Sequence, residues 1–346
     1  MFPATFVSRS KMVDDIDGDC YTKIEKAYNA GMPFFTKAAI REAVRAIDSI
    51  VLDGRSDETV PITGIDGATV SFRLRMGEII SGSSTFILKQ PLLCYHPIEM
   101  MMGLIEPCGA CSPSAHDHEC ACLPMAVCHE ADKIDRSTKE IIHYFPISPK
   151  LKIQVEFLAY HDKWRASEGF DGLKSIFEGQ DGAVKVPHGV NKVVAFGLGS
   201  LAWWGQRENS ASQHALVLSV RDFLQARGLG KVACYAQDPD YQAVDKEILN
   251  LSGITVLDDP RAFLEVDETS VVVSIHPGLP VRQVVADIAR PAVMIWHRDT
   301  YKQLGPQKAD PTSPRVEQML EKHYVEVEWD FDHKLFGDTA VYVRKI

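Results

Sequence analysis

The stretch that decides the fold is Val193–Leu218, with the sequence VVAFGLGSLAWWGQRENSASQHALVL. It starts as a short apolar, β-branched run, breaks at two glycines, and resumes helical periodicity only after about ten residues. A buried strand, a loop and a helix in this order are typical of a doubly wound sheet. The loop itself has three interpretations: a nucleotide cradle, a holder for a nucleophile, or a plain turn.

The chain after Val193–Leu218 repeats this alternation. Residues 231–239 read as a strand, residues 241–253 as a helix that stops at Gly253, and residues 270–278 as another strand. We therefore predict that residues 191–346 form a Rossmann-like, doubly wound, mostly parallel α/β sheet with helices on both faces. In such a sheet, ligand sites form beyond the carboxyl ends of the strands. The residues predicted at these ends are 197–200, 237–240, 258–259, 276–278 and 297–299.

The first part of the chain, residues 1–190, lacks this rhythm and reads as an N-terminal α+β cap. We expect a helix within residues 34–52 and a hairpin whose turn is Ile65–Gly67. Residues 152–160 are expected to form a short strand, and residues 170–178 a helix. A cysteine- and histidine-rich insert occupies residues 94–129.

Composition excludes several classes of protein. The chain has 346 residues, 45% of them hydrophobic, and a net charge of −10, so a generally basic, nucleic-acid-binding surface is absent. No apolar run approaches the roughly 20 residues that cross a bilayer, and the amino terminus lacks a signal-peptide core. We expect a cytoplasmic location, where the eight cysteines would be thiols or metal ligands rather than disulfides.

The two glycines fit a dinucleotide fingerprint only in part. Gly197, Gly199 and Ala202 match G-x-G-x-x-G/A directly after a strand. The helix, however, is expected to start late, with Asn209 or Ser210 as its N-cap, which would keep its N–H groups away from a pyrophosphate. The nearest strand-end acid, Asp238, follows about 40 residues on, instead of the usual 20 or so.

Ser200 is the alternative focus of the loop. A serine at a strand tip can be presented as a nucleophile, although a lone serine in a turn is commonly structural. Trp203 and Trp204 are either core anchors or the wall of a pocket. Together with Gln213, they are our candidate substrate-binding residues on this stretch.

Acidic residues are expected to gather on the same rim of the sheet. Asp238, Asp258, Asp259 and Glu265 would suit a cationic substrate group or proton transfer, whereas helix capping and turns are the alternative for Asp259 and Asp238. His276, before Pro277-Gly278, is a candidate general base or a structural histidine. We predict Ser200, Asp258, Asp259 and His276 as catalytic, and Asp238 and Glu265 as substrate-binding.

The insert carries the spacing of metal ligands. A C-x-x-C pair followed closely by further cysteines and histidines can close around one zinc ion, and a thiol-rich loop is the alternative. The candidate ligands are Cys108, Cys111, His116, His118, Cys120 and Cys122. A structural zinc is the only cofactor that these residues indicate, and none is expected to be required for catalysis.

Several motifs together resemble a known family. They are FGLGS, ENSASQHAL, YAQDPDY, GITVLDDPRAFLEVD, SIHPGLPVRQVVADIARPAVMIW and FGDTAVYVRK, with MPFFTKAAIREAV further upstream. The chain resembles the sensitivity-to-red-light-reduced-like domain family, and within it a fungal branch that is similar to arginine-containing cyclodipeptide synthases. The cysteine-rich insert has no counterpart in this resemblance.

The resemblance implies an aminoacyltransferase of secondary metabolism that makes an arginine-containing diketopiperazine from two aminoacyl-tRNAs. It implies that Ser200 accepts an aminoacyl group and that arginyl-tRNA is one partner, held by a local basic patch. The D-D-x-x-E motif of the fungal enzymes is absent, and Asp258-Asp259 with Glu265 is the nearest match. The alternatives are a non-enzymatic circadian or stress regulator of the same family and a nucleotide-cofactor-binding enzyme. The candidate patch residues are Arg207, Lys231, Arg282, Arg290 and Arg298.

Overall fold

The computed structural model divides the chain into two compact units, which are described separately below. The first comprises residues 1–142 and 301–313, and the second residues 143–300 and 314–346. The described residues are 18–52, 58–105, 122–142, 148–179, 184–203, 205, 207–228, 230–298 and 309–346.

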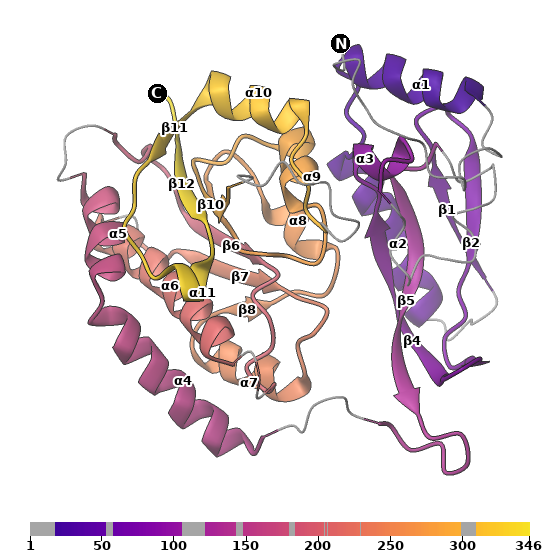
Figure 1. Ribbon diagram of the computed structural model, residues 1–346, viewed down its shortest axis with the longest axis horizontal. Coiled ribbons are helices and arrows are strands. Elements are labelled where there is room, and N and C mark those ends of the chain that lie inside the picture. Colours follow the sequence, from indigo (N-terminus) through magenta and orange to yellow (C-terminus); the bar gives the residue numbers. More distant parts are fainter. Residues whose placement is uncertain are drawn as a thin grey trace. The chain divides into compact units, whose positions relative to one another are not determined.

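The second unit is built on a seven-stranded sheet with the strand order β11-β12-β10-β9-β6-β7-β8 (Figure 1). The five strands from β10 to β8 in this order are parallel, while β12 runs antiparallel to β10 and β11 antiparallel to β12. The predicted mostly parallel, doubly wound sheet is confirmed. Its strands are β6 (Lys192–Phe196), β7 (Ala233–Gln237), β8 (Thr255–Val256), β9 (Ser270–Ser274), β10 (Val293–His297), β11 (Tyr324–Val327) and β12 (Thr339–Arg344).

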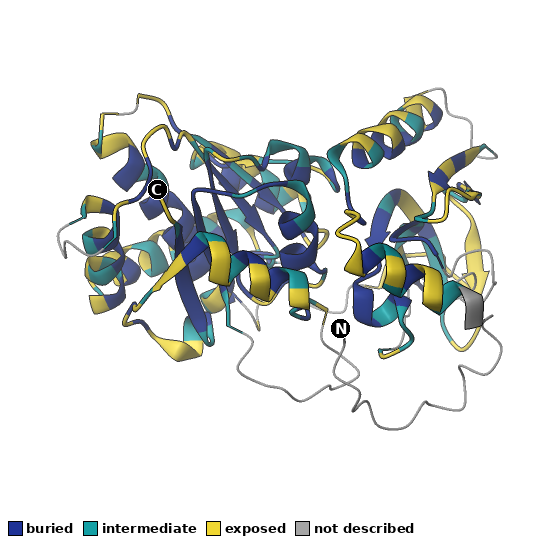
Figure 2. Cartoon of the chain, turned by 90° about the horizontal axis from the view of Figure 1, so that it is seen from above, coloured by how far each residue is buried: buried dark blue, intermediate teal, exposed yellow. Residues whose placement is uncertain are grey.

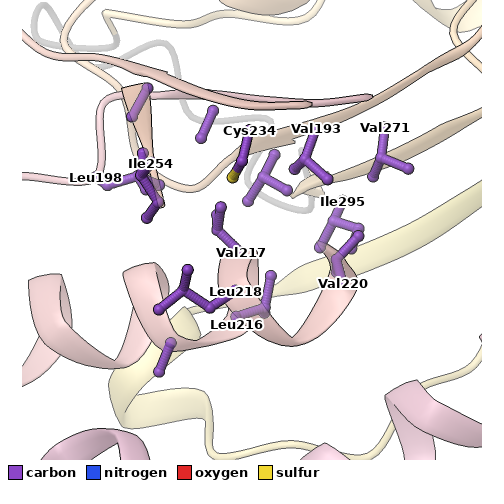
Figure 3. Packing of buried hydrophobic residues seen from close by; sticks show 14 of the residues in the cluster. Val193, Leu198, Leu216, Val217, Leu218, Val220, Cys234, Ile254, Val271 and Ile295 are labelled. Atoms are coloured by element: carbon purple, nitrogen blue, oxygen red, sulfur yellow. The ribbon is translucent and has the colours of Figure 1, made fainter. Parts of the chain in front are cut away.

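Helices cover both faces of this sheet because its central strands are apolar on both sides. Figure 2 shows these strands almost entirely in the colour of buried residues. On one face, Val217 and Val220 of the long helix α6 meet Val193 and Ile295 of the strands (Figure 3). On the other, Phe196 stacks on Phe263 with ring centroids 4.4 Å apart. The helices of this unit are α4 (Lys150–Arg165), α5 (Glu168–Glu178), α6 (Arg207–Ala226), α7 (Ala243–Leu251), α8 (Arg261–Glu265), α9 (Val281–Ile288), α10 (Pro314–His323) and α11 (His333–Phe336).

The topology determines where a ligand can lie. From β6 the chain proceeds to β7 and β8 on one side, and then returns to place β9 and β10 on the other. The strand order therefore reverses between β6 and β9. Beyond the carboxyl ends of two such strands the connections diverge and leave a crevice, which is where open α/β sheets bind ligands.

Helix α4 corrects one of our predictions. The alternation in residues 152–160 suggested a strand, but the segment is helical, and its side chains Ile153 and Phe157, four residues apart, are buried against the core. Trp164, near the end of α4, donates a hydrogen bond from Nε1 to Ser219 Oγ of α6 at 3.0 Å. Because α4 and α5 pack onto this core, the compact unit starts at His143, earlier than the expected 190/191 boundary.

The described residues of the first unit form two small antiparallel sheets and three helices. The hairpin expected around Ile65–Gly67 is confirmed, with Thr63 paired to Thr69 across the turn. The helix expected within residues 34–52 is also confirmed, as α2 (Lys37–Leu52). The remaining elements are α1 (Gly18–Asn29), β1 (Thr59–Thr63), β2 (Thr69–Arg73), β3 (Ile79–Ser81), β4 (Thr85–Tyr95), α3 (Ile98–Met101) and β5 (Met125–Ile134).

Cysteine pairing in this unit differs from our expectation. Cys94 and Cys128 lie on the neighbouring strands β4 and β5 and form a disulfide, with their Cα atoms 6.3 Å apart. The expectation of thiols or metal ligands is therefore wrong for this pair, because antiparallel pairing of β4 with β5 makes the two residues diagonal neighbours, Cys94 lying opposite Ala126 and Cys128 opposite Leu92. Among the described residues, no helix is long and apolar enough to span a membrane.

Candidate functional site

A crevice of about 420 Å³ lies at the predicted position, outside the carboxyl ends of β6 and β9. Four segments contribute to it: the loop after β6, the first turns of α6, the residues after β9, and helix α11. Within the part of the chain that the structure describes, none of the lining side chains is acidic. They are Gly197, Leu198, Gly199, Asn209, Ser210, Gln213, Ile275, His276, His333, Lys334, Leu335 and Gly337.

The two glycines after β6 are required by close packing as well as by backbone conformation. Gly197 has φ +65°, and a Cβ atom there would lie 2.7 Å from Pro277. Gly199 has φ +76°, and its Cβ would lie 2.6 Å from the Ser210 hydroxyl. Any side chain would therefore push the loop after β6 away from the segment after β9 or from α6.

Helix α6 begins earlier than the sequence suggested. Its first residue is Arg207, so the predicted N-cap residues Asn209 and Ser210 lie inside its first turn. Both line the same crevice as Gly197 and Gly199. The start of α6 therefore lies beside the glycines, despite the loop before it. The expectation that a late helix start would keep its N–H groups away from a phosphate is wrong.

Ser200 is buried, which corrects the prediction that the strand end exposes it. Only 1% of its surface is accessible, and it is not among the residues that line the crevice. Its hydroxyl donates to Asp245 Oδ2 at 2.6 Å, and the Ala202 N–H donates to Asp245 Oδ1 at 3.0 Å. The Gln242 N–H also donates to this carboxylate. Ser200 and Asp245 therefore fasten the loop after β6 to helix α7.

His276 is the lining residue with the most unusual conformation. It follows β9, its side chain is exposed, and its φ is +54°, in the left-handed region that only a few non-glycine residues adopt. Its ring lies 4.2 Å from the ring of His297, measured between centroids. Desolvation, followed by the charge of Arg282, lowers the pKa of His276, so the imidazole is neutral near pH 7. A neutral imidazole in a crevice is able to accept a proton.

Gly337 leaves the space that the His276 ring occupies, because it has no side chain. A Cβ at this glycine would lie 2.1 Å from His276 Nε2, and its φ and ψ of +63° and −145° favour glycine.

We expect Gly337→Ala to destabilise the fold by about 2–3 kcal/mol, part from the backbone and part from the clash. Urea unfolding of Gly337→Ala in the wild-type and His276→Ala backgrounds separates the two. An equal loss in both backgrounds would show that the histidine is not displaced.

The acidic residues predicted for one rim do not converge there. Asp238 accepts the Gly199 N–H at 2.6 Å, and burial raises the pKa of its carboxyl group. Asp258 is exposed and pairs with Lys246 Nζ at 2.8 Å. Both acids therefore have partners within the fold, and neither lines the crevice.

Asp259 and Glu265 also correct the prediction. Asp259 accepts from the Gln237 amide at 2.7 Å, and it is Gln237 Oε1 that accepts the Ala262 N–H at the start of α8. The backbone carbonyl of Glu265 accepts from the hydroxyl of Ser270, the first residue of β9. Glu265 therefore lies at the amino end of that strand, away from the crevice, because α8 runs back across the sheet.

Of the two predicted tryptophans and the six predicted metal ligands, only Trp203 and Cys122 lie within the described residues. Trp203 is half-buried and packs against the hydrophobic core, as an anchor would, and Trp204 lies outside the described residues. Cys108, Cys111, His116, His118 and Cys120 also lie outside them, while Cys122 is buried. Within the described residues, no three His, Cys, Asp or Glu side chains gather as a metal site would require.

The candidate basic residues do not form an open patch. Arg207 is 4% exposed and pairs with Glu156, and Arg282 is equally buried. Arg298 pairs with Glu326 and Asp338, and Arg290 donates to backbone carbonyls of residues 286 and 289. Only Lys231 is exposed. In the described structure, four of these five side chains are therefore buried or bonded to other groups of the fold. The five residues do not form an exposed basic patch.

His214 is a buried titratable residue that the sequence did not single out. Its Nδ1 bonds to the Ser210 carbonyl at 2.6 Å and its Nε2 to the Tyr241 hydroxyl at 2.7 Å, so the neutral ring is fully paired. Burial lowers its pKa from 6.5 to about 4. In the unfolded chain His214 therefore binds a proton below about pH 6.5, whereas in the folded chain it binds one only below about pH 4.

This shift predicts a loss of stability in acid. Between pH 6.5 and pH 4, His214 should lower the free energy of unfolding by up to about 3 kcal/mol. The measurement is urea unfolding at several pH values for the wild type and for His214→Gln, because the other titrating groups cancel in the difference. A difference that does not change with pH would contradict the expectation.

Sequence reasoning missed the residues of α11 that complete the crevice. His333, Lys334, Leu335 and Gly337 come from a four-residue helix, and the residue after it, near the end of the chain. No motif connects them with Gly197–Gly199, and only the antiparallel return of β12 beside β10 brings them close. A glycine after HKLF was the one available signal.

Comparison with known proteins gives one match. Neither the curated proteins nor the solved structures contain a match to the chain. A family model does match it over residues 173–343, which extend from α5 through the seven strands and α11 into the end of β12. Every residue that lines the crevice falls within this range. Residues 173–343 of this chain are therefore similar to the SRR1 domain family.

Proposed function

We propose that the crevice is an active site in which His276 acts as the general base. The observation that carries this proposal is the geometry of His276. Its backbone is strained at φ +54°, and its ring is confined between His297 and the side-chain-free Gly337. Strained residues of this kind concentrate at catalytic sites, and the lowered pKa keeps the ring ready to accept a proton.

The reaction that we propose is aminoacyl-tRNA-dependent cyclodipeptide synthesis, which is supported by the motif resemblance. The amine of one aminoacyl-tRNA attacks the ester carbonyl of the other, a peptide bond forms, and the ester bond to the tRNA breaks. The second amine then closes the ring and releases the second tRNA. In each step His276 takes the proton from the attacking amine and returns it to the leaving 3′ oxygen.

The proposal differs from the sequence-based mechanism in two respects. Ser200 is buried and its hydroxyl donates a hydrogen bond to Asp245, so we propose direct transfer between the two substrates without a covalent serine intermediate. Among the described residues, no carboxylate lines the crevice to pair with a guanidinium group, so the described lining does not favour arginine as the amino acid held inside it. The choice of amino acids is therefore left to the experiment.

The test is a product assay. The purified chain is incubated with pairs of charged tRNAs, including arginyl-tRNA, and diketopiperazines are sought by mass spectrometry. We expect a product from at least one pairing, and a Ser200→Ala chain that folds should still form it. Absence of product from every pairing would overturn the synthase proposal and favour a regulatory domain that binds ligands without turnover.

A second candidate, a nucleotide-cofactor-binding enzyme, is favoured by one specific observation. Gly197, Gly199 and the first turn of α6 line the same crevice. Equilibrium dialysis with NAD and S-adenosylmethionine tests it, because retention of either by the wild type, together with loss in Gly199→Val, is the result expected of a cofactor site.

A further inference from the structure

We infer that the crevice binds a nucleoside phosphate, with the phosphate at the first turn of α6 beside Lys334 and the base at the amide of Gln213. The inference rests on the proposed function in using the same crevice, but it concerns binding and requires no particular reaction. Two independent features support it, one for each end of the ligand.

The first feature is an environment suited to an anion. Helix α6 has 20 residues, and the N–H groups of a helix's first turn have no acceptors within the helix. Asn209 and Ser210 of that turn line the crevice, and so does the exposed Lys334. None of the described residues that line it is acidic. The helix dipole and the lysine therefore both favour a negatively charged group at this end.

The second feature is an amide oxygen without a partner, at the other end. Gln213 is 7% exposed and lines the crevice, and its buried Oε1 has no hydrogen-bond partner among the described residues. Such an atom costs about 1–3 kcal/mol, which a ligand donor would recover. A carboxamide presents a donor and an acceptor side by side, and this pair matches a nucleobase edge such as that of adenine.

The spacing of the two features agrees with one small ligand. Gln213 is four residues after Asn209, so the two positions are about 6 Å apart along the helix axis. The crevice volume of about 420 Å³ is within the usual range for small-molecule sites. The same nucleoside phosphate could be a free nucleotide or the terminal nucleotide of an RNA chain, and the experiment separates these sources.

The first arm of the test measures the base contact. Titration calorimetry compares adenosine 5′-monophosphate with ribose 5-phosphate, which lacks the base, on the wild type, Gln213→Leu and Gln225→Leu. Gln225 is an exposed residue of the same helix and serves as the matched control. We expect Gln213→Leu to weaken the nucleotide about tenfold or more and to leave ribose 5-phosphate unchanged. Gln225→Leu should alter neither.

Thermal stability provides a second readout for Gln213→Leu. Since the substitution removes a buried amide oxygen that has no partner among the described residues, the melting temperature should stay equal or rise while nucleotide affinity falls. A purely structural glutamine would instead give a lower melting temperature. Absence of nucleotide binding to the wild type, or equal nucleotide affinity in the wild type and Gln213→Leu, would overturn the inference.

The second arm addresses the phosphate and the source of the nucleotide. Lys334→Ala should weaken adenosine monophosphate and ribose 5-phosphate by the same factor. An RNA oligonucleotide with a free 3′ terminal adenosine is then compared with the same oligonucleotide circularised. If the oligonucleotide with the free 3′ end binds more tightly than adenosine monophosphate, the natural ligand is an RNA end. If adenosine monophosphate binds more tightly, the natural ligand is a free nucleotide.

Two assays on the wild-type chain, nucleotide titration and diketopiperazine formation, separate this inference from the proposed function. Nucleotide binding without diketopiperazine formation leaves the inference standing and removes the synthase proposal. Product formation without nucleotide binding leaves the synthase proposal standing and overturns the inference.

Discussion

A His276→Asn chain should form product more slowly by about 100-fold or more, with an unchanged fold. Asparagine is also tolerated at positive φ, so the backbone at +54° need not change. The substitution removes the described lining group that is both strained and held neutral, so the proton of the attacking amine loses the acceptor that we propose for it. The measurement is the initial rate of diketopiperazine formation with the most productive tRNA pair.

The pH dependence provides a second test of the same residue. Because desolvation and Arg282 lower the pKa of His276, the wild-type rate should rise through a pKa below 6.5 and be level at neutral pH. The His276→Asn profile should lack this rise. His188→Asn, at an exposed turn of the same unit, is the matched control and should behave as the wild type. Equal rates for His276→Asn and the control would exclude His276 as the base.

An Asp245→Ala chain should be destabilised by about 4 kcal/mol, the largest stability effect that we expect from one substitution. The carboxylate is fully buried and accepts hydrogen bonds from the Ser200 hydroxyl and the backbone N–H groups of Ala202 and Gln242. Alanine removes the acceptor that these three donors share, although the Ala202 N–H keeps the Ser200 hydroxyl as a second acceptor at 3.0 Å. Each donor left unpaired costs about 1–3 kcal/mol before relaxation and water entry reduce the sum. Urea unfolding at pH 7 measures the change.

Two further variants show whether the Asp245 network is the cause. Asp171→Ala, at an exposed position in the first turn of α5, is the matched control and should cost less than about 1 kcal/mol. Ser200→Ala removes one donor and should cost about 1 kcal/mol. In the double variant the two losses should not add, because the substitutions remove the same hydrogen bond. Additive losses would mean that Ser200 and Asp245 act independently.

The alternation of residues after Lys192 determined the fold of the second unit. Apolar runs such as VVAF and SVVVS, separated by amphipathic segments, are buried on both faces only in a parallel sheet between helices. The same local pattern failed at residues 152–160. There the alternation of apolar and polar residues was accidental, and packing of Ile153 and Phe157 on the core, which requires helical spacing, decided the structure.

For the site, the sequence by itself determined the position of the loop after β6 and the glycines that shape it, because strand ends and positive-φ turns leave local signals. The tertiary structure alone decided what this loop does. Burial of Ser200 depends on Asp245, which is 45 residues away in the chain, and the crevice wall depends on α11 at the end of the chain. Such contacts follow from strand order and helix packing, which residue spacing does not encode. The GLGS stretch is therefore a recognisable strand end in the sequence, and only the fold determines that its serine is buried and its glycines face the crevice.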